Sequence, residues 1–103
     1  MSEGHQHTVH GENVVLDIGG DVGALVIYTD PQLSGQEIEI RRTGDDGPKA
    51  HTEVHPRRLG DAGVHGAVFA ALIAGEYDLW PPGVAGPVSV RIDGGRVAEL
   101  DWR

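Results

Sequence analysis

An apolar run that breaks at one glycine and resumes as an alternating pattern is the feature of this chain that most limits its fold. The run starts at Phe69 and ends before Gly75, after which Tyr77 and Leu79 alternate with polar residues. Glycine adopts the positive φ of a tight turn without a Cβ clash, so we expect Gly75 to join two strands. Tyr77 follows this turn, where its ring can fill the core. Its hydroxyl can then bond the backbone upstream, as in the tyrosine corner of β-sandwiches.

Short alternating segments separated by turns recur along the rest of the chain. In Glu37–Arg41, two isoleucines alternate with charged residues, which indicates a strand with one buried face. The nearly continuous apolar segment 24–29 indicates a central strand that is packed on both sides, or one covered by the tail or a partner. Pro56 interrupts segment 51–59, and because proline cannot donate to a ladder, we expect that strand at an edge or broken there. Glycine-rich turns are predicted to close hairpins at 19–23, 60–63 and 93–95.

These segments predict the fold class. No window shows a 3.6-residue apolar period, so we expect no α-helix longer than about two turns. The sequence predicts an all-β fold, a seven- to eight-stranded antiparallel Greek-key β-sandwich. Its expected strands are residues 14–18, 24–29, 37–41, 51–59, 64–72, 76–80, 88–92 and 97–102.

The pattern around the glycine turn resembles the signature of transthyretin-like domains, the family that includes carboxypeptidase regulatory-like and Cna-B-type modules. The residues that carry the resemblance are Phe69, Leu72, Gly75, Tyr77 and Leu79. The resemblance is strongest over residues 64–103. It implies a Greek-key sandwich and a packing or scaffolding role, because such domains often have that role in larger proteins.

The segment VVLDIGGDVGAL, which begins at Val14, is similar to the start of short bacterial proteins that are sometimes labelled phospholipase. A phospholipase needs an activated serine or histidine with a base and an oxyanion site, or a clustered metal site. The serines are Ser2, Ser34 and Ser89, and Ser34 lacks the first glycine of a nucleophile elbow. The sequence therefore predicts no enzymatic activity.

Composition narrows the partners and the compartment. The 103 residues carry a net charge of −8, which disfavours nucleic-acid binding because that affinity depends on neutralising phosphates. The longest apolar run, 67–74, is too short to span a bilayer, and no signal peptide is visible. The chain has no cysteine. We therefore expect a cytoplasmic protein with no nucleic-acid or membrane partner.

The histidines at the start of the chain are the only group whose residue types predict a specific chemistry. Residues 1–12 are polar and lack periodicity, so we interpret them as a flexible tail before a single β-sandwich domain, residues 13–103. His5, His7 and His10 in such a tail can wrap nickel, zinc or copper. The alternative is a solvated tail with no metal role. His51 and His55, on one face of a strand, lie about 13 Å apart and cannot chelate one ion together.

Trp80 is a candidate binding residue outside the tail. If Tyr77 and Leu79 point inward, Trp80 points outward beside Pro81, where it could anchor a protein partner or a sugar ring. Alternatively, Trp80 packs under the loop at 81–87 or against the tail. Trp102 is expected in the core or closing one end of it.

Three functions remain open at this point. The first is a small non-enzymatic accessory or protein-interaction module, with an unknown protein partner or as a homodimer. The second is a metal-handling protein that uses the His-rich tail. The third is a carbohydrate-binding module centred on Trp80.

Overall fold

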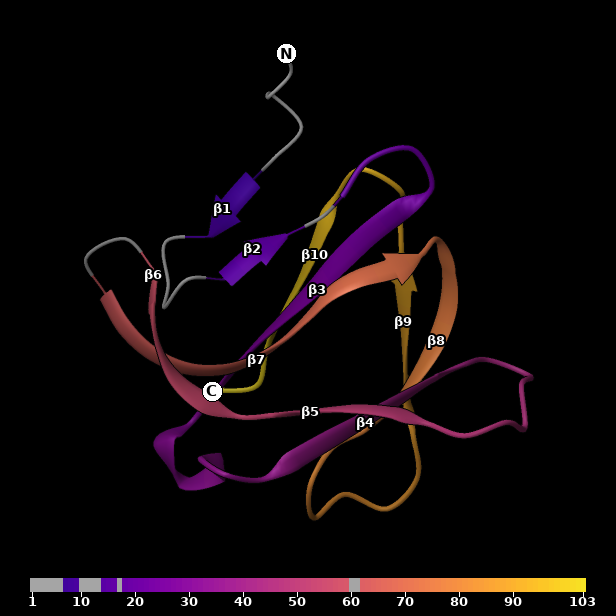
Figure 1. Ribbon diagram of the computed structural model, residues 1–103. Helices are drawn as coiled ribbons and strands as arrows, with labels where there is room; N and C mark the ends of the chain where they lie inside the picture. Colours follow the sequence, from indigo (N-terminus) through magenta and orange to yellow (C-terminus); the bar gives the residue numbers. More distant parts are fainter. Residues whose placement is uncertain (1–6, 10–13, 17, 60–61) are drawn as a thin grey trace.

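The computed structural model of the chain describes residues 7–9, 14–16, 18–59 and 62–103 (Figure 1). These residues form ten strands and one short 3-10 helix, η2 (Pro31–Leu33), and contain no α-helix, as the sequence predicted. In this part of the chain, no helix is long and apolar enough to cross a membrane. The strands are β1 (His7–Val9), β2 (Val14–Leu16), β3 (Val22–Thr29), β4 (Glu37–Arg42), β5 (Ala50–Glu53), β6 (His55–Leu59), β7 (Ala62–Ile73), β8 (Gly75–Trp80), β9 (Val88–Ile92) and β10 (Val97–Asp101).

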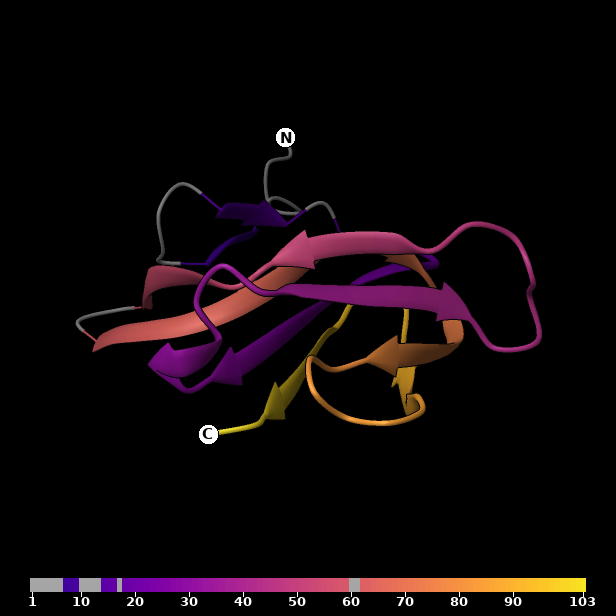
Figure 2. The same cartoon turned by 90° about the horizontal axis from the view of Figure 1, so that it is seen from below.

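Two four-stranded sheets and one two-stranded sheet make up the fold. One large sheet has the strand order β10-β3-β7-β6, the other has the order β5-β4-β8-β9, and β1 pairs with β2. The β1–β2 pair lies against β7 (Figure 2). Buried side chains from both large sheets form one core, which comprises Leu25, Ile27, Ile38, Ile40, Val54, Ala67, Phe69, Tyr77, Leu79, Val90 and Ile92.

Strand β3 is buried on both faces, which confirms the prediction for segment 24–29. Leu25 and Ile27 point into the main core and are fully buried. Ala24 points to the opposite face, where it forms a second small cluster with Ile18. Val68 and Val97 pack against that second cluster. Apolar side chains on both faces of β3 therefore pack against other parts of the chain.

Segment 51–59 is divided between the two sheets. Strand β5 pairs with β4, whereas β6 pairs with β7, and both β5 and β6 are edge strands. The break falls at Val54 rather than at Pro56. Val54 is fully buried, and its N–H donates to the Gln36 carbonyl at 2.9 Å while its carbonyl accepts from the Gly35 N–H at 2.8 Å. This division, together with β1, explains why the described residues form more strands than the predicted seven or eight.

One strand pair corrects the prediction of a wholly antiparallel fold. Strand β10 runs parallel to β3, with Val97 opposite Ala24 and Asp101 opposite Tyr28, and the other pairs are antiparallel. The predicted hairpin at 93–95 is also wrong, because β9 and β10 belong to different sheets. This turn instead carries the chain from one sheet to the edge of the other.

The two glycine-rich turns at 19–23 and 93–95 pack against each other. Gly95 N–H donates to the Val22 carbonyl at 2.9 Å, and Ala24 N–H donates to the Arg96 carbonyl at 3.0 Å. A Cβ on Gly94 would collide with the Gly20 carbonyl, so this close approach requires glycine. The turn at 19–23 forms a Gly19–Val22 bridge, but the strands on either side of it do not pair as the predicted hairpin. The hairpin predicted around 60–63 is confirmed by the pairing of β6 with β7.

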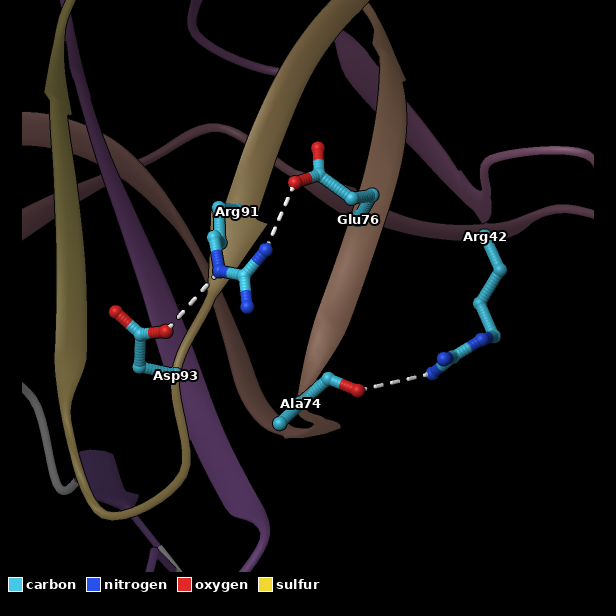
Figure 3. Close-up of polar contacts among 5 residues, drawn as sticks. All are labelled: Arg42, Ala74, Glu76, Arg91 and Asp93. Atoms are coloured by element: carbon cyan, nitrogen blue, oxygen red, sulfur yellow. Dashed lines mark hydrogen bonds and ion pairs between the residues drawn. The ribbon is translucent and has the colours of Figure 1, made fainter.

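The corner predicted at Gly75 and Tyr77 is present. Gly75 has a φ of +151°, and it carries the chain from β7 in one sheet to β8 in the other. The Tyr77 ring is buried, and its hydroxyl donates to the Ile73 carbonyl at 2.7 Å. Arg42 also contacts this corner, which no sequence pattern predicted. Its guanidinium lies over the Tyr77 ring, 5.4 Å from the centroid, and donates to the Ala74 carbonyl at 3.4 Å (Figure 3).

Candidate interaction surface

An apolar groove lies where the η2 turn, the loop between β8 and β9, and the chain end after β10 meet. Its volume is about 280 Å³. Two of its residues are unusually exposed for their type, since Val84 is 53% and Val88 is 40% exposed. The groove is lined by Leu33, Pro81, Pro82, Val84, Val88 and Trp102.

Local turn chemistry explains why Val84 projects from the surface. Val84 N–H donates to the Pro81 carbonyl at 3.4 Å, with Pro82 and Gly83 as the two central residues of the turn. Gly83 has a φ of +74°. Proline at the first central position and a positive-φ glycine at the second are the signature of a type II turn. Because this turn ends β8 and reverses the chain, the valine after it is held away from the main core.

Trp102 forms the opposite wall of the groove. The backbone N–H of Trp102 donates to the Tyr28 carbonyl at 2.7 Å, which extends the β10–β3 pairing beyond β10. The half-buried indole packs against the main core together with Leu33 and Leu100. Trp102 therefore closes one end of the core, as predicted, and also presents part of its surface to the groove.

An acidic hollow adjoins the apolar groove, and Pro82 lines both. The hollow has a volume of about 540 Å³, and its other lining residues are Gly35, Gln36, Glu37, Glu39 and Gly83. Glu37 and Glu39 lie on the outer face of β4, since Ile38 between them is fully buried. Apolar and negatively charged surfaces are therefore continuous at this end of the molecule.

Trp80 lies on the same outer face, and cationic side chains lie over its ring. Lys49 Nζ is 4.2 Å and Arg41 Cζ is 5.2 Å from the ring centroid. Lys49 also forms an ion pair with Glu39 at 3.6 Å, and Arg41 donates to the Gly47 carbonyl at 3.2 Å. The indole thus holds the loop that connects β4 to β5. A sugar ring could stack on Trp80 only where these cations leave its face open.

The side chains of the predicted metal ligands lie outside the part of the chain that the structure describes. His5 and His10 lie outside the described residues, and His7 lies in β1, whose side chains are also outside the description. His51 and His55 are exposed and face different carboxylates, Glu37 at 3.9 Å and Glu53 at 3.2 Å. Within the described ranges, no group of three or more His, Cys, Asp or Glu could hold a metal ion.

Charged residues elsewhere on the surface form paired networks. Arg91 bridges Glu76 at 3.1 Å and Asp93 at 3.3 Å (Figure 3), and hydrogen bonds to these carboxylates raise the pKa of Arg91. Near the chain end, hydrogen bonds from Arg103 lower the pKa of Asp101 to about 2. Each of these exposed carboxylates is paired with an arginine of opposite charge.

Burial and the carboxylate of Glu99 raise the pKa of Tyr28, whose hydroxyl donates to Glu99 at 3.1 Å. The Arg103 guanidinium lies over the Tyr28 ring, 5.0 Å from its centroid. These contacts lie beside Trp102 and position the end of the chain that forms one wall of the groove.

Comparison with known proteins adds no assignment. The chain matches no protein-family model, no curated protein and no solved structure.

Proposed function

We propose that this chain is a protein-interaction module that binds a partner segment in the groove between the β8–β9 loop and Trp102. The observation that carries the proposal is the concave apolar surface itself, with Val84 53% and Val88 40% exposed at its rim. Exposed apolar side chains gathered on a concave surface are typical of interaction sites, whereas single ones are not.

The size and chemistry of the groove favour a side-chain anchor over a whole small molecule. Small-molecule sites enclose about 300–1,000 Å³ and contain several polar groups that fix the ligand. This groove has a volume of about 280 Å³, and its lining consists of Leu33, two prolines, two valines and Trp102. An aromatic or aliphatic side chain from a partner, buried against Trp102 and Val88, fits this surface.

For the fold, we propose a Greek-key β-sandwich of the transthyretin-like kind. Two features support it. The chain passes between the two large sheets four times, after β3, β5, β7 and β9, so that β4 lies beside β8 and β3 beside β7. The Tyr77 hydroxyl bonds the backbone four residues upstream, which is the hydrogen bond of a tyrosine corner. Such a fold is a rigid support for a binding surface built from loops and does not itself define an activity.

Substitution of Val84 tests the interaction. Val84→Asp places a charge in the apolar groove while changing a side chain outside the core, so the free energy of unfolding should be nearly unchanged. Ile73→Asp is the matched control, because Ile73 is equally exposed, at 51%, but is not part of the groove. Proteins captured from a lysate of the source cell by the wild type should be lost with Val84→Asp and retained with Ile73→Asp. Equal capture by the three forms would contradict the proposal.

A further inference from the structure

We infer that the partner is a cationic extended segment, in which an apolar side chain enters the groove and a neighbouring Lys or Arg reaches Glu37 and Glu39. The inference rests on the proposed function, because it names the chemistry of the partner for the same surface. Two observations carry it: the continuity of the groove with the acidic hollow at Pro82, and the charge of the whole chain.

The spacing of the two carboxylates suits an extended partner. Glu37 and Glu39 are two residues apart on β4, so their Cα atoms lie about 7 Å apart on one face. Residues two apart in an extended partner have the same spacing and also point to one side. A partner that places one side chain against Pro82 and Trp102 can therefore present one or two basic side chains to the hollow.

These carboxylates are open to a new partner. The Glu37 side chain is 55% exposed, and its ion-pair partner is His51 at 3.9 Å, which compensates the charge only when protonated. The Glu39 side chain is 45% exposed and pairs with Lys49 at 3.6 Å, but Lys49 also lies over the Trp80 ring. A basic partner side chain would add a cation beside Glu37, whose ion-pair partner is a histidine, and beside Glu39, which pairs with Lys49.

The net charge of the chain favours a different protein, and not a second copy of this chain, as the partner that occupies the groove. Each copy carries −8, so two copies repel one another at low ionic strength, whereas a basic partner is attracted over the same distances. We therefore assign the groove to a basic partner and treat self-association as an outcome of the test.

Selection from a displayed library of random dodecapeptides against the full chain tests the inference. We expect selected peptides to combine Leu, Ile, Phe or Trp with Lys or Arg within two positions. Their affinity should fall more than about tenfold in Val84→Asp and stay unchanged in Ile73→Asp. The double variant Glu37→Gln and Glu39→Gln should weaken them about three- to tenfold at low salt, in the range of partly exposed ion pairs. Asp45→Asn with Asp46→Asn removes the same charge in the loop after β4, away from the hollow, and should leave affinity unchanged.

The outcomes separate the two proposals. Peptides that depend on Val84 but show no basic residues, or that bind the Glu37/Glu39 variant equally well, would overturn the cationic partner and leave the interaction module intact. If the selection yields no peptide whose binding depends on Val84, and Val84→Asp captures the same proteins from the lysate as the wild type, both the interaction module and the cationic partner are overturned. A dimer in sedimentation that Val84→Asp dissociates would replace the basic partner with a second copy.

Discussion

Tyr77→Phe should destabilise the fold by about 1 kcal/mol, because it removes the two hydrogen bonds of the hydroxyl and leaves the packing of the ring in place. The Tyr77 hydroxyl donates to the Ile73 carbonyl at 2.7 Å and accepts from Arg42 Nη1 at 3.3 Å. In the variant, the Ile73 carbonyl keeps the longer contact to Arg42, at 3.5 Å. The ring itself stays in the core, where Tyr77 is 6% exposed.

The magnitude follows from the two lost contacts. A partly buried neutral hydrogen bond contributes about 0.5–1.5 kcal/mol net, whereas the contact with Arg42 is long, at 3.3 Å, and adds little. For a domain near 100 residues, about 1 kcal/mol corresponds to a fall in Tm of roughly 4–8 °C. Tyr28→Phe is the matched control. The Tyr28 hydroxyl donates to Glu99 at 3.1 Å on the surface, so its loss should cost less than about 0.5 kcal/mol.

Urea unfolding followed by the fluorescence of the two tryptophans measures both variants under one condition. Equal midpoints for Tyr77→Phe and the wild type, with an unchanged slope, would show that the Ile73 hydrogen bond does not hold the corner. A larger loss for Tyr28→Phe than for Tyr77→Phe would refute the assignment of the corner as the more stabilising of the two tyrosine contacts.

Three further predictions concern other parts of the chain. Gly75→Ala should lower the free energy of unfolding by about 1–3 kcal/mol, because Gly75 has a positive φ that alanine adopts only with strain. Part of that loss should disappear when Arg42→Ala is also present, because the new Cβ would lie 2.6 Å from Arg42 Nη2. Additive losses in a double-mutant cycle would exclude this contact. The pKa of Asp101 is about 2 in the folded chain against 3.8 ordinarily, so its ionised carboxylate stabilises the fold above about pH 4 and this contribution is lost as the pH falls towards 2. In Arg103→Ala, the pKa of Asp101 measured by carboxyl NMR should move back towards its ordinary value. An unchanged pKa would contradict the pairing. Calorimetry with nickel or zinc should show binding to the full chain at pH 7.5 and weak binding at pH 5.5, since unperturbed histidines titrate near about 6.5. Removal of residues 1–12 should abolish this binding, and tight binding by the shortened chain would place the metal site elsewhere.

The sequence predicted the features that depend on neighbouring residues. Alternation placed Ile38 and Ile40 inside and Glu37 and Glu39 outside, and the structure confirms this. The glycine turn before Tyr77 was predicted from local chemistry alone, because a positive φ and a hydrogen bond four residues upstream involve one short stretch of chain. The positions of strands and the direction in which their side chains point are therefore determined by local sequence.

Pairing between distant segments was not predictable in the same way. Nothing within 93–95 shows that this turn joins two sheets instead of closing a hairpin, because both geometries use glycine. The deciding contact is the fit of Gly94 against the Gly20 carbonyl, which lies more than seventy residues earlier in the chain. Arg42 was missed for the same reason. Its role depends on Ile73 and Ala74, to which no spacing rule connects it.

The groove could not be predicted from the sequence, although most of the strands could. Its lining residues come from the η2 turn, the β8–β9 loop, β9 and the chain end, and none of them forms a motif with its sequence neighbours. One local signal existed: Val84 is an apolar residue directly after a Pro-Pro-Gly turn, where an exposed valine has no role in the core. The outward direction of Glu37 and Glu39 was also predicted correctly, but the sequence does not show that Pro82 lies beside them. The groove depends on the parallel placement of β10 on β3, which brings Trp102 to the β8–β9 loop. A change in that topology would remove the groove while leaving every predicted strand intact.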